Sequence, residues 1–172
     1  MSKRTTAIIL FLSVFALQDA LAQVKIGYTN PARVLNELPE VEEVDQQINT
    51  LIEQRDQELA AKATDLQQIF SNYESSMANL SQQERANKEQ ELMELNDQFE
   101  QDRESMMNEI RQKRNELMAP IIERMNTAME EVAQEMGLDL VLNEGTSYGD
   151  AIIFFADNEG LDITDKIIAK LK

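Results

Sequence analysis

Several residue types are missing from this chain, and each absence narrows what the protein can be. The 172 residues include no cysteine and no histidine. Without cysteine no disulfide can form, so non-covalent packing has to hold the fold together. The chain also has no glycine-rich phosphate loop and no spacing typical of a metal site. We therefore predict a protein that is not an enzyme and that uses no cofactor and no metal.

Glycine and proline are absent from residues 40–119, a stretch dense in Glu, Gln, Lys, Arg, Leu, Met and Ala. These are strong helix formers, and the residues that end helices are missing. The stretch is either one rod or two antiparallel helices. Ser81, with Glu84 three residues later, is typical of a capping box that begins a new helix. We therefore predict a helical hairpin that turns near residues 80–81.

Apolar residues recur on both arms of this hairpin at spacings of three and four, as in a coiled-coil seam. Folding the chain at the predicted turn places Leu66 opposite Leu95 and Ala63 opposite Phe99. At 1.5 Å per residue, each arm of about 40 residues is about 60 Å long. That length exceeds any compact globule of this size, so we expect the hairpin to project from a separate body as a tentacle.

The apolar pairing fails near the predicted turn. Apolar residues of the first arm face residues 81–91, where Ala86 is the only apolar residue. Two interpretations remain open: a frayed tip that folds on itself, or a surface that contacts a client protein. Methionine, common on the returning arm, adapts to irregular partners. The candidate client contacts are Phe70, Tyr73, Met77, Leu80, Met93 and Phe99.

Residues 1–22 have the pattern of a secretory signal peptide. Lys3 and Arg4 precede an apolar run over residues 7–17, and Ala20-Leu21-Ala22 fits a cleavage site after Ala22. No later run is apolar enough for stable membrane insertion. The remaining chain has 14 basic and 31 acidic residues, a formal charge of −17. We expect an exported, soluble protein that does not bind nucleic acid.

The two ends of the mature chain are predicted to form a small α+β body. Residues 23–39 supply a strand at 24–28 and a short helix that begins at Pro31. Residues 120–172 supply the helix base, closed by Gly137, strands at 138–143 and 151–156, and a C-terminal helix capped by Asp162 with Asp165. The long antiparallel hairpin of residues 40–119 lies between them.

The predicted third strand is apolar on both faces, and one small helix cannot cover both. The missing cover then has to come from other subunits, which would also remove exposed strand edges. Sequence physics does not determine the number of subunits. The predicted self-association residues are Ile26, Leu140, Leu142, Ile152, Ile153, Phe154 and Phe155.

An ordered series of segments resembles the Skp/OmpH family of periplasmic chaperones over essentially the whole mature chain. No single segment is decisive, because each consists of residues that pack in the fold. The order and spacing of the segments match those of the family. The segments are residues 25–28, 33–35, 99–103, 120–122, 128–132, 137–142 and 162–171. The resemblance implies a jellyfish-shaped homotrimer whose strands form the body and whose three hairpins enclose a cavity. It also implies ATP-independent holding of unfolded outer-membrane proteins in the periplasm.

One departure from the family concerns charge. Well-known members carry basic tentacles suited to anionic lipid, whereas this chain is strongly acidic. The resemblance therefore does not carry a lipopolysaccharide site to this chain. A rival hypothesis of another class is a structural coiled-coil spacer or envelope scaffold. A spacer has reason to fill its seam, whereas a client cradle has reason to leave apolar residues accessible.

Overall fold

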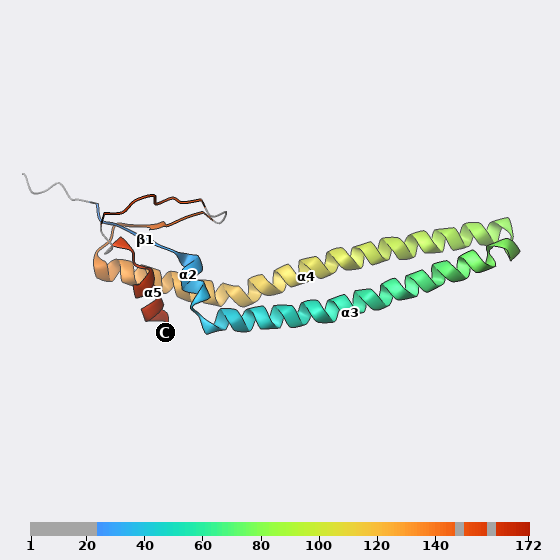
Figure 1. Ribbon diagram of the computed structural model, residues 1–172, viewed down its shortest axis with the longest axis horizontal. Coiled ribbons are helices and arrows are strands. Elements are labelled where there is room, and N and C mark those ends of the chain that lie inside the picture. The colour runs from blue at the N-terminus through green and yellow to red at the C-terminus, as the bar shows by residue number, and fades with distance from the viewer. Residues whose placement is uncertain (1–23, 147–149, 158–160) are drawn as a thin grey trace, which may run out of the picture. The chain divides into compact units, whose positions relative to one another are not determined.

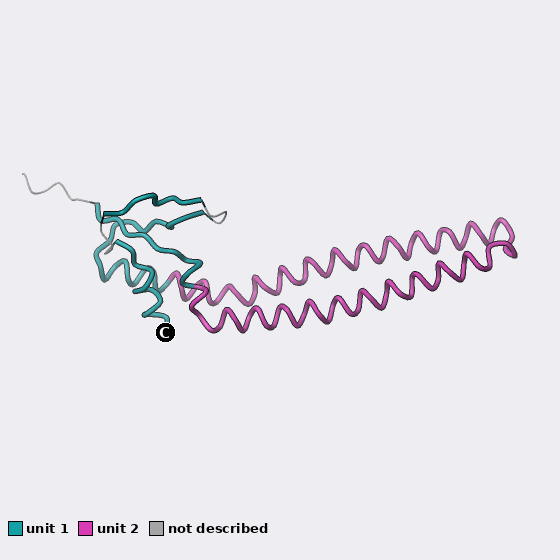
Figure 2. The backbone as a smooth tube through the Cα atoms, viewed as in Figure 1, with its two compact units in different colours: residues 1–34, 127–172 teal, residues 35–126 magenta. Residues whose placement is uncertain are grey.

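A computed structural model of the protein describes residues 24–146, 150–157 and 161–172. The predicted signal peptide lies outside the described residues. The chain divides into two compact units, shown in different colours in Figure 2. The first combines the N-terminal residues up to Val34 with residues 127–172, and the second comprises residues 35–126. The predicted tentacle, residues 40–119, falls within the second unit.

The second unit is an antiparallel helical hairpin (Figure 1). Its outgoing arm is α3 (Pro39–Ser76), which is followed by the single 3-10 turn η1 (Met77–Asn79). Its returning arm is α4 (Gln82–Met136), whose last residues belong to the first unit. Helix α3 begins with Pro39. Proline is tolerated in the first turn of a helix, because a backbone N–H there would make no hydrogen bond within the helix. The predicted helical hairpin is confirmed, and the chain turns between the end of α3 and the start of α4 at Gln82.

The capping box at the start of α4 explains why the chain turns where it does. The Ser81 backbone N–H donates to Glu84 Oε2 at 2.8 Å, and the Glu84 N–H donates to Ser81 Oγ at 3.3 Å. These reciprocal bonds satisfy two backbone donors that a helix start would otherwise leave unpaired. Hydrogen bonds from Ser81 lower the pKa of Glu84, which keeps its carboxylate charged as an acceptor.

The first unit contains a small parallel sheet of two strands. Strand β1 (Ile26–Thr29) pairs with β2 (Leu140–Asn143), with Ile26 beside Leu140 and Thr29 beside Asn143. Between α4 and β2, Gly137 adopts a φ of 62°, a left-handed conformation that only glycine takes readily. The two predicted strands are confirmed, with observed bounds one or two residues inside or beyond the predicted ones.

Two helices complete this unit. Helix α2 (Pro31–Asn36) follows β1 and buries Val34, and α5 (Thr164–Leu171) follows Ile163 near the C-terminus. The predicted apolar face of α5 is buried at Ile163, Ile167 and Ile168. The predicted capping residue Asp162 accepts hydrogen bonds from the backbone N–H of Thr164 at 2.9 Å and from its hydroxyl at 2.6 Å.

A hydrogen-bonded contact joins the two ends of the first unit. The Thr164 hydroxyl accepts from the Asn30 backbone N–H at 3.0 Å and lies 3.3 Å from the Thr29 hydroxyl. Thr29 and Thr164 are both buried, so this contact places polar groups inside the unit without leaving them unpaired. Arg33 of α2 pairs with Asp165 of α5 at the surface. These contacts bring residues more than 130 positions apart in the sequence together.

The predicted third strand at residues 151–156 is wrong. Only an isolated bridge between Gly145 and Ala151 forms there, and the N–H groups of Ile152 and Ile153 both donate to the Glu144 carbonyl. The far side of β1 is already occupied, because the Ile163 N–H donates to the Tyr28 carbonyl. Ile152, Phe154 and Phe155 of this segment are exposed, so its apolar composition alone does not make it join the sheet.

Candidate functional site

An apolar groove runs between the two arms of the hairpin. It has a volume of about 610 Å³ and is lined from α3 by Leu66 and Phe70 and from α4 by Leu92, Met93 and Phe99. Phe70 is 50% exposed and Met93 is 62% exposed, although both lie on the groove. Large apolar side chains that gather around an open groove are the usual sign of a binding surface.

The helical repeat explains how these residues come together. Leu66 and Phe70 are four positions apart on α3, and Leu92 and Phe99 are seven positions apart on α4, so each pair lies on one helix face. A second hollow of about 330 Å³ is lined by Leu66, Ile69, Leu95 and Phe99. Leu66 and Phe99 line both hollows. Between these two hollows, the apolar contact between the arms is therefore narrow, and there is open space on both sides of it.

Ion pairs connect the arms between this groove and the open end of the hairpin. Arg55 donates through Nε and Nη2 to the two carboxylate oxygens of Glu109, at 3.0 and 2.7 Å, and Lys62 pairs with Asp102. Hydrogen bonding to Arg55 lowers the pKa of Glu109, and hydrogen bonding to Lys62 lowers that of Asp102. Both carboxylates are thus held in the charged form that the pairing needs.

Two further ion pairs lie toward the open end of the hairpin, where α3 begins. Arg114 donates to Asp45 at 2.8 Å, and Arg124 donates to Glu40 at 2.7 Å. Hydrogen bonding to Arg124 also lowers the pKa of Glu40. Three of the four cross-arm pairs share one antiparallel register, namely Glu40–Arg124, Arg55–Glu109 and Lys62–Asp102. The side chains are partly exposed, so each pair specifies alignment more than it adds stability.

Near the tip of the hairpin, Tyr73 packs against the facing arm. Its ring is only 9% exposed, and its hydroxyl donates to Glu89 Oε1 across the arms at 2.8 Å. This hydrogen bond raises the pKa of Tyr73, and desolvation of the hydroxyl is the second cause of the increase. Tyrosine has an apolar ring with a polar end, so it can cover a hydrophilic helix while its hydroxyl finds a partner. Burial of Tyr73 favours the interpretation in which the tip folds on itself, and its role as a client contact stays a prediction.

The other predicted client contacts fall into two groups. Phe70, Met93 and Phe99 line the apolar groove, and Phe99 is half-buried there. Met77 is 44% exposed in η1, and Leu80 is half-buried beside the turn; neither lines the groove. Sequence reasoning placed Leu66 and Leu92 in the seam and missed them as groove residues. Their shared three-and-four spacing with Phe70 and Phe99 was the available signal.

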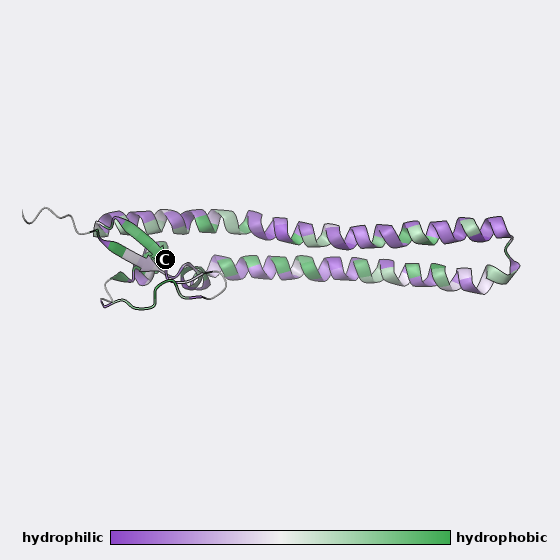
Figure 3. Cartoon of the chain, turned by 90° about the horizontal axis from the view of Figure 1, so that it is seen from above, coloured by the Kyte–Doolittle hydropathy of each residue, from purple (hydrophilic) through white to green (hydrophobic). Residues whose placement is uncertain are grey.

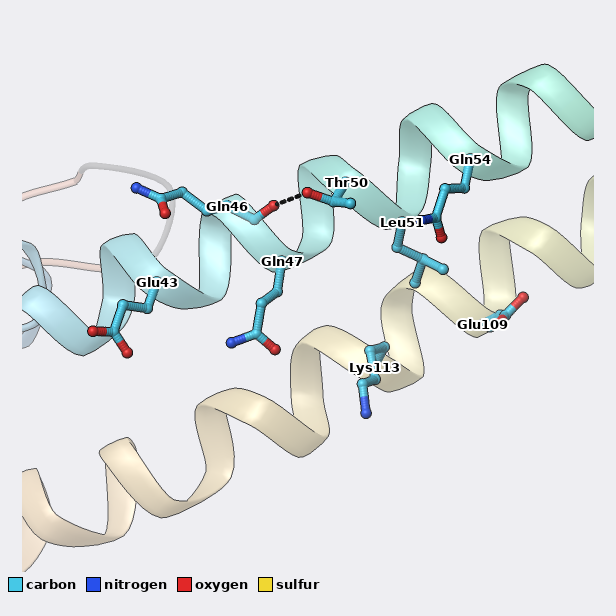
Figure 4. A pocket seen from close by; sticks show the side chains of 8 residues that line it. All are labelled: Glu43, Gln46, Gln47, Thr50, Leu51, Gln54, Glu109 and Lys113. Atoms are coloured by element: carbon cyan, nitrogen blue, oxygen red, sulfur yellow. Dashed lines mark hydrogen bonds between the residues drawn. The ribbon is translucent and has the colours of Figure 1, made fainter.

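A larger hollow near the open end has the wrong chemistry for an apolar ligand. Its volume is about 780 Å³, and Figure 4 shows its polar lining. Thr50 donates to the Gln46 carbonyl at 2.9 Å, so its hydroxyl is already used within α3. Leu51 is the one apolar residue among its lining side chains, which are Glu43, Gln46, Gln47, Thr50, Leu51, Gln54, Glu109 and Lys113. We therefore take the smaller apolar groove as the candidate site.

The predicted self-association residues lie in the first unit and are mostly exposed. Phe154 is 90% exposed and Phe155 is 81% exposed, values unusual for aromatic side chains of a lone folded chain. Ile26, Leu140 and Ile152 are also exposed, whereas Leu142 and Ile153 are half-buried. These residues belong to β1, β2 and the segment after residue 150.

The described part of the chain lacks the features of two other kinds of site. Residues 24–146, 150–157 and 161–172 contain no cluster of three or more acidic side chains placed to hold a metal ion. Among the helices that these ranges contain, none has the length and apolarity needed to cross a membrane.

The family of the chain follows from a match over most of its length. The family model described as "Outer membrane protein (OmpH-like)" matches residues 25–171. The chain belongs to the OmpH-like family. The predicted Skp/OmpH resemblance is thereby confirmed. This chaperone family is non-enzymatic, so this OmpH-like protein is not an enzyme.

Individual relatives of this OmpH-like protein agree with the family match. It is 26% identical over 153 residues to the chaperone protein Skp of Photorhabdus laumondii and to that of Photorhabdus luminescens. Each match covers 89% of this chain and 88% of the relative. The crystal structure of an OmpH-like protein from Caulobacter crescentus superposes with a TM-score of 0.67 at 18% identity, covering 87% of this chain and 85% of that one. The structural likeness supports the fold.

Proposed function

We propose that this OmpH-like protein is an ATP-independent holdase of the periplasm. It binds unfolded outer-membrane proteins and prevents their aggregation before membrane insertion. The single observation that carries this proposal is the open apolar groove, with Phe70 and Met93 half exposed on facing arms. Several weak apolar contacts of this kind retain an unfolded chain without selecting one sequence. Family membership supports the same function.

The proposal includes self-association into a homotrimer through the first unit. Phe154 and Phe155 are the strongest support, because burying two such aromatic side chains gives a large apolar contribution. Export through the predicted signal peptide, with cleavage after Ala22, belongs to the same proposal. The rival function, a coiled-coil spacer, is less well supported because a spacer gains stability from a filled seam.

An aggregation assay tests the holdase function. A denatured β-barrel protein is diluted into buffer without ATP, with and without the mature protein, and light scattering is followed. We expect suppression near equimolar trimer, and weaker suppression by a Phe70→Ser, Met93→Ser variant. Met107→Ser is the matched control, because Met107 is 61% exposed on the same helix but does not line the groove. No suppression by the unmodified protein at several-fold excess would contradict the proposal.

A further inference from the structure

We propose that the apolar groove prefers client segments in which lysine or arginine lies two or three positions from an apolar residue. This inference rests on the proposed holdase function and names the kind of segment that the groove takes. The charged residues that line the groove are Asp97 and Glu100, both acidic and both on α4. An apolar surface bordered by carboxylates complements a cationic apolar segment.

The helical repeat puts the carboxylates and the exposed methionine on the same side. Asp97 and Glu100 follow Met93 by four and seven residues, so all three lie on one face of α4. Along the helix axis the carboxylates are about 6 and about 10 Å beyond Met93, at 1.5 Å per residue. An extended client chain advances about 3.3 Å per residue. A cation two or three positions from the apolar anchor therefore comes within reach of Asp97 or Glu100.

The local partner of Glu100 leaves it available. Arg103 donates to Glu100 Oε2 at 2.9 Å from one turn further along the same helix, and more than half of each side chain is exposed. An exposed pair three residues apart within one helix adds little free energy. A client cation can therefore share or replace Arg103 at small cost.

The net negative charge of the whole chain also favours binding of cationic client segments. Acidic residues exceed basic ones by 16 in the full sequence. A field of one sign attracts oppositely charged segments and raises their association rate, and salt weakens the effect. This long-range attraction does not distinguish one part of the chain from another. Asp97 and Glu100 give the apolar groove a local attraction for cations, because both residues line it.

Binding of labelled peptides to the mature full-length protein tests the preference. Three peptides share one Phe-Leu-Phe core and differ only in flanking residues, which are lysine, serine or glutamate, and affinities come from fluorescence anisotropy. We expect the lysine-flanked peptide to bind about two- to thirty-fold more tightly than the serine-flanked one, the range for two exposed ion pairs. The preference should shrink between ~0.1 M and ~1 M salt, as the Debye length falls from about 10 to about 3 Å.

A charge-matched pair of variants separates the groove from the general field. Asp97→Asn with Glu100→Gln removes two carboxylates from the groove. Glu94→Gln with Glu104→Gln removes two from the same helix that do not line it. Both variants have the same net charge, and circular dichroism checks that both keep their helicity. The first is expected to lose most of the lysine preference and the second to keep it.

The possible failures are distinguishable. Equal affinity of the unmodified protein for the lysine- and glutamate-flanked peptides overturns this inference while leaving the holdase function in place. Equal loss of preference in the two variants also overturns it, since the general field would then account for the effect. Absence of binding to all three peptides contradicts the holdase function itself, and this inference with it.

Discussion

The two ends of the hairpin are held together in different ways. At the open end, five apolar side chains are less than 8% exposed: Leu38, Val44, Ile48, Ile121 and Met125. Between residues 49 and 120, the stretch that contains the turn, Tyr73 is the only buried apolar residue. Polar pairs connect the arms there instead. Figure 3 shows α4 mostly hydrophilic along much of its length. One hairpin thus combines a packed end that supplies stability with an open stretch that keeps apolar side chains accessible.

Paired substitutions at Ile48 and Leu66 give the largest expected effect. Ile48 is 1% exposed, so Ile48→Ala leaves a cavity and lowers the free energy of unfolding by about 2–5 kcal/mol. Leu66 is only half-buried between two hollows, and Leu66→Ala costs about 1 kcal/mol. Urea unfolding at one fixed protein concentration measures both. Equal losses would remove the distinction between the two ends.

Removal of the cap at the turn has an intermediate expected effect. Ser81→Ala deletes the hydroxyl that accepts from the Glu84 N–H and costs about 1 kcal/mol. Ser75→Ala is the control, because Ser75 only bonds back to the Ser71 carbonyl within α3. Amide hydrogen exchange around residues 76–90 reports the change locally. Faster exchange in both variants alike would show that the cap does not hold the turn.

Acid titration of a cross-arm pair gives the smallest expected effect. The folded-state pKa of Glu109 lies below its unfolded value, so its stabilising contribution is present above about pH 4.3 and is lost as pH falls through the folded pKa. We expect the stability difference between the unmodified protein and Glu109→Gln to be largest near neutral pH and to vanish in acid. Thermal unfolding across this pH range measures it, with Glu104→Gln as control. A difference that grows in acid would reverse the assigned sign.

Local signals in the sequence were sufficient to predict the hairpin. The absence of Gly and Pro from residues 40–119 and the Ser81–Glu84 cap act within a few residues, so they could be recognised without knowledge of the fold. Phe70 and Phe99 were also accessible from helical spacing, and Met93 from the abundance of methionine on the returning arm. The position of Asp97 at the groove was not predicted, because one sequence does not show which acidic residues border an apolar surface.

One contact that the sequence did not reveal and one wrong prediction both involve partners elsewhere in the sequence. Tyr73 was treated as purely apolar, and its contact with Glu89 across the turn could not be recognised from composition. The segment 151–156 has strand-like composition, but pairing depends on a free edge, and Asp162 and Ile163 already occupy the side of β1 at Tyr28. Strand propensity is decided by neighbours more than by the residues themselves.

The common register of three cross-arm ion pairs limits how such a hairpin can change length. Arg55 meets Glu109 and Lys62 meets Asp102, so an insertion in one arm alone would misalign the pairs on one side of it. A matched insertion in the other arm restores them, and multiples of seven residues also preserve the apolar stripe. Lengthening or shortening during evolution is therefore expected to occur as compensated pairs of indels, placed at equal distances from the turn.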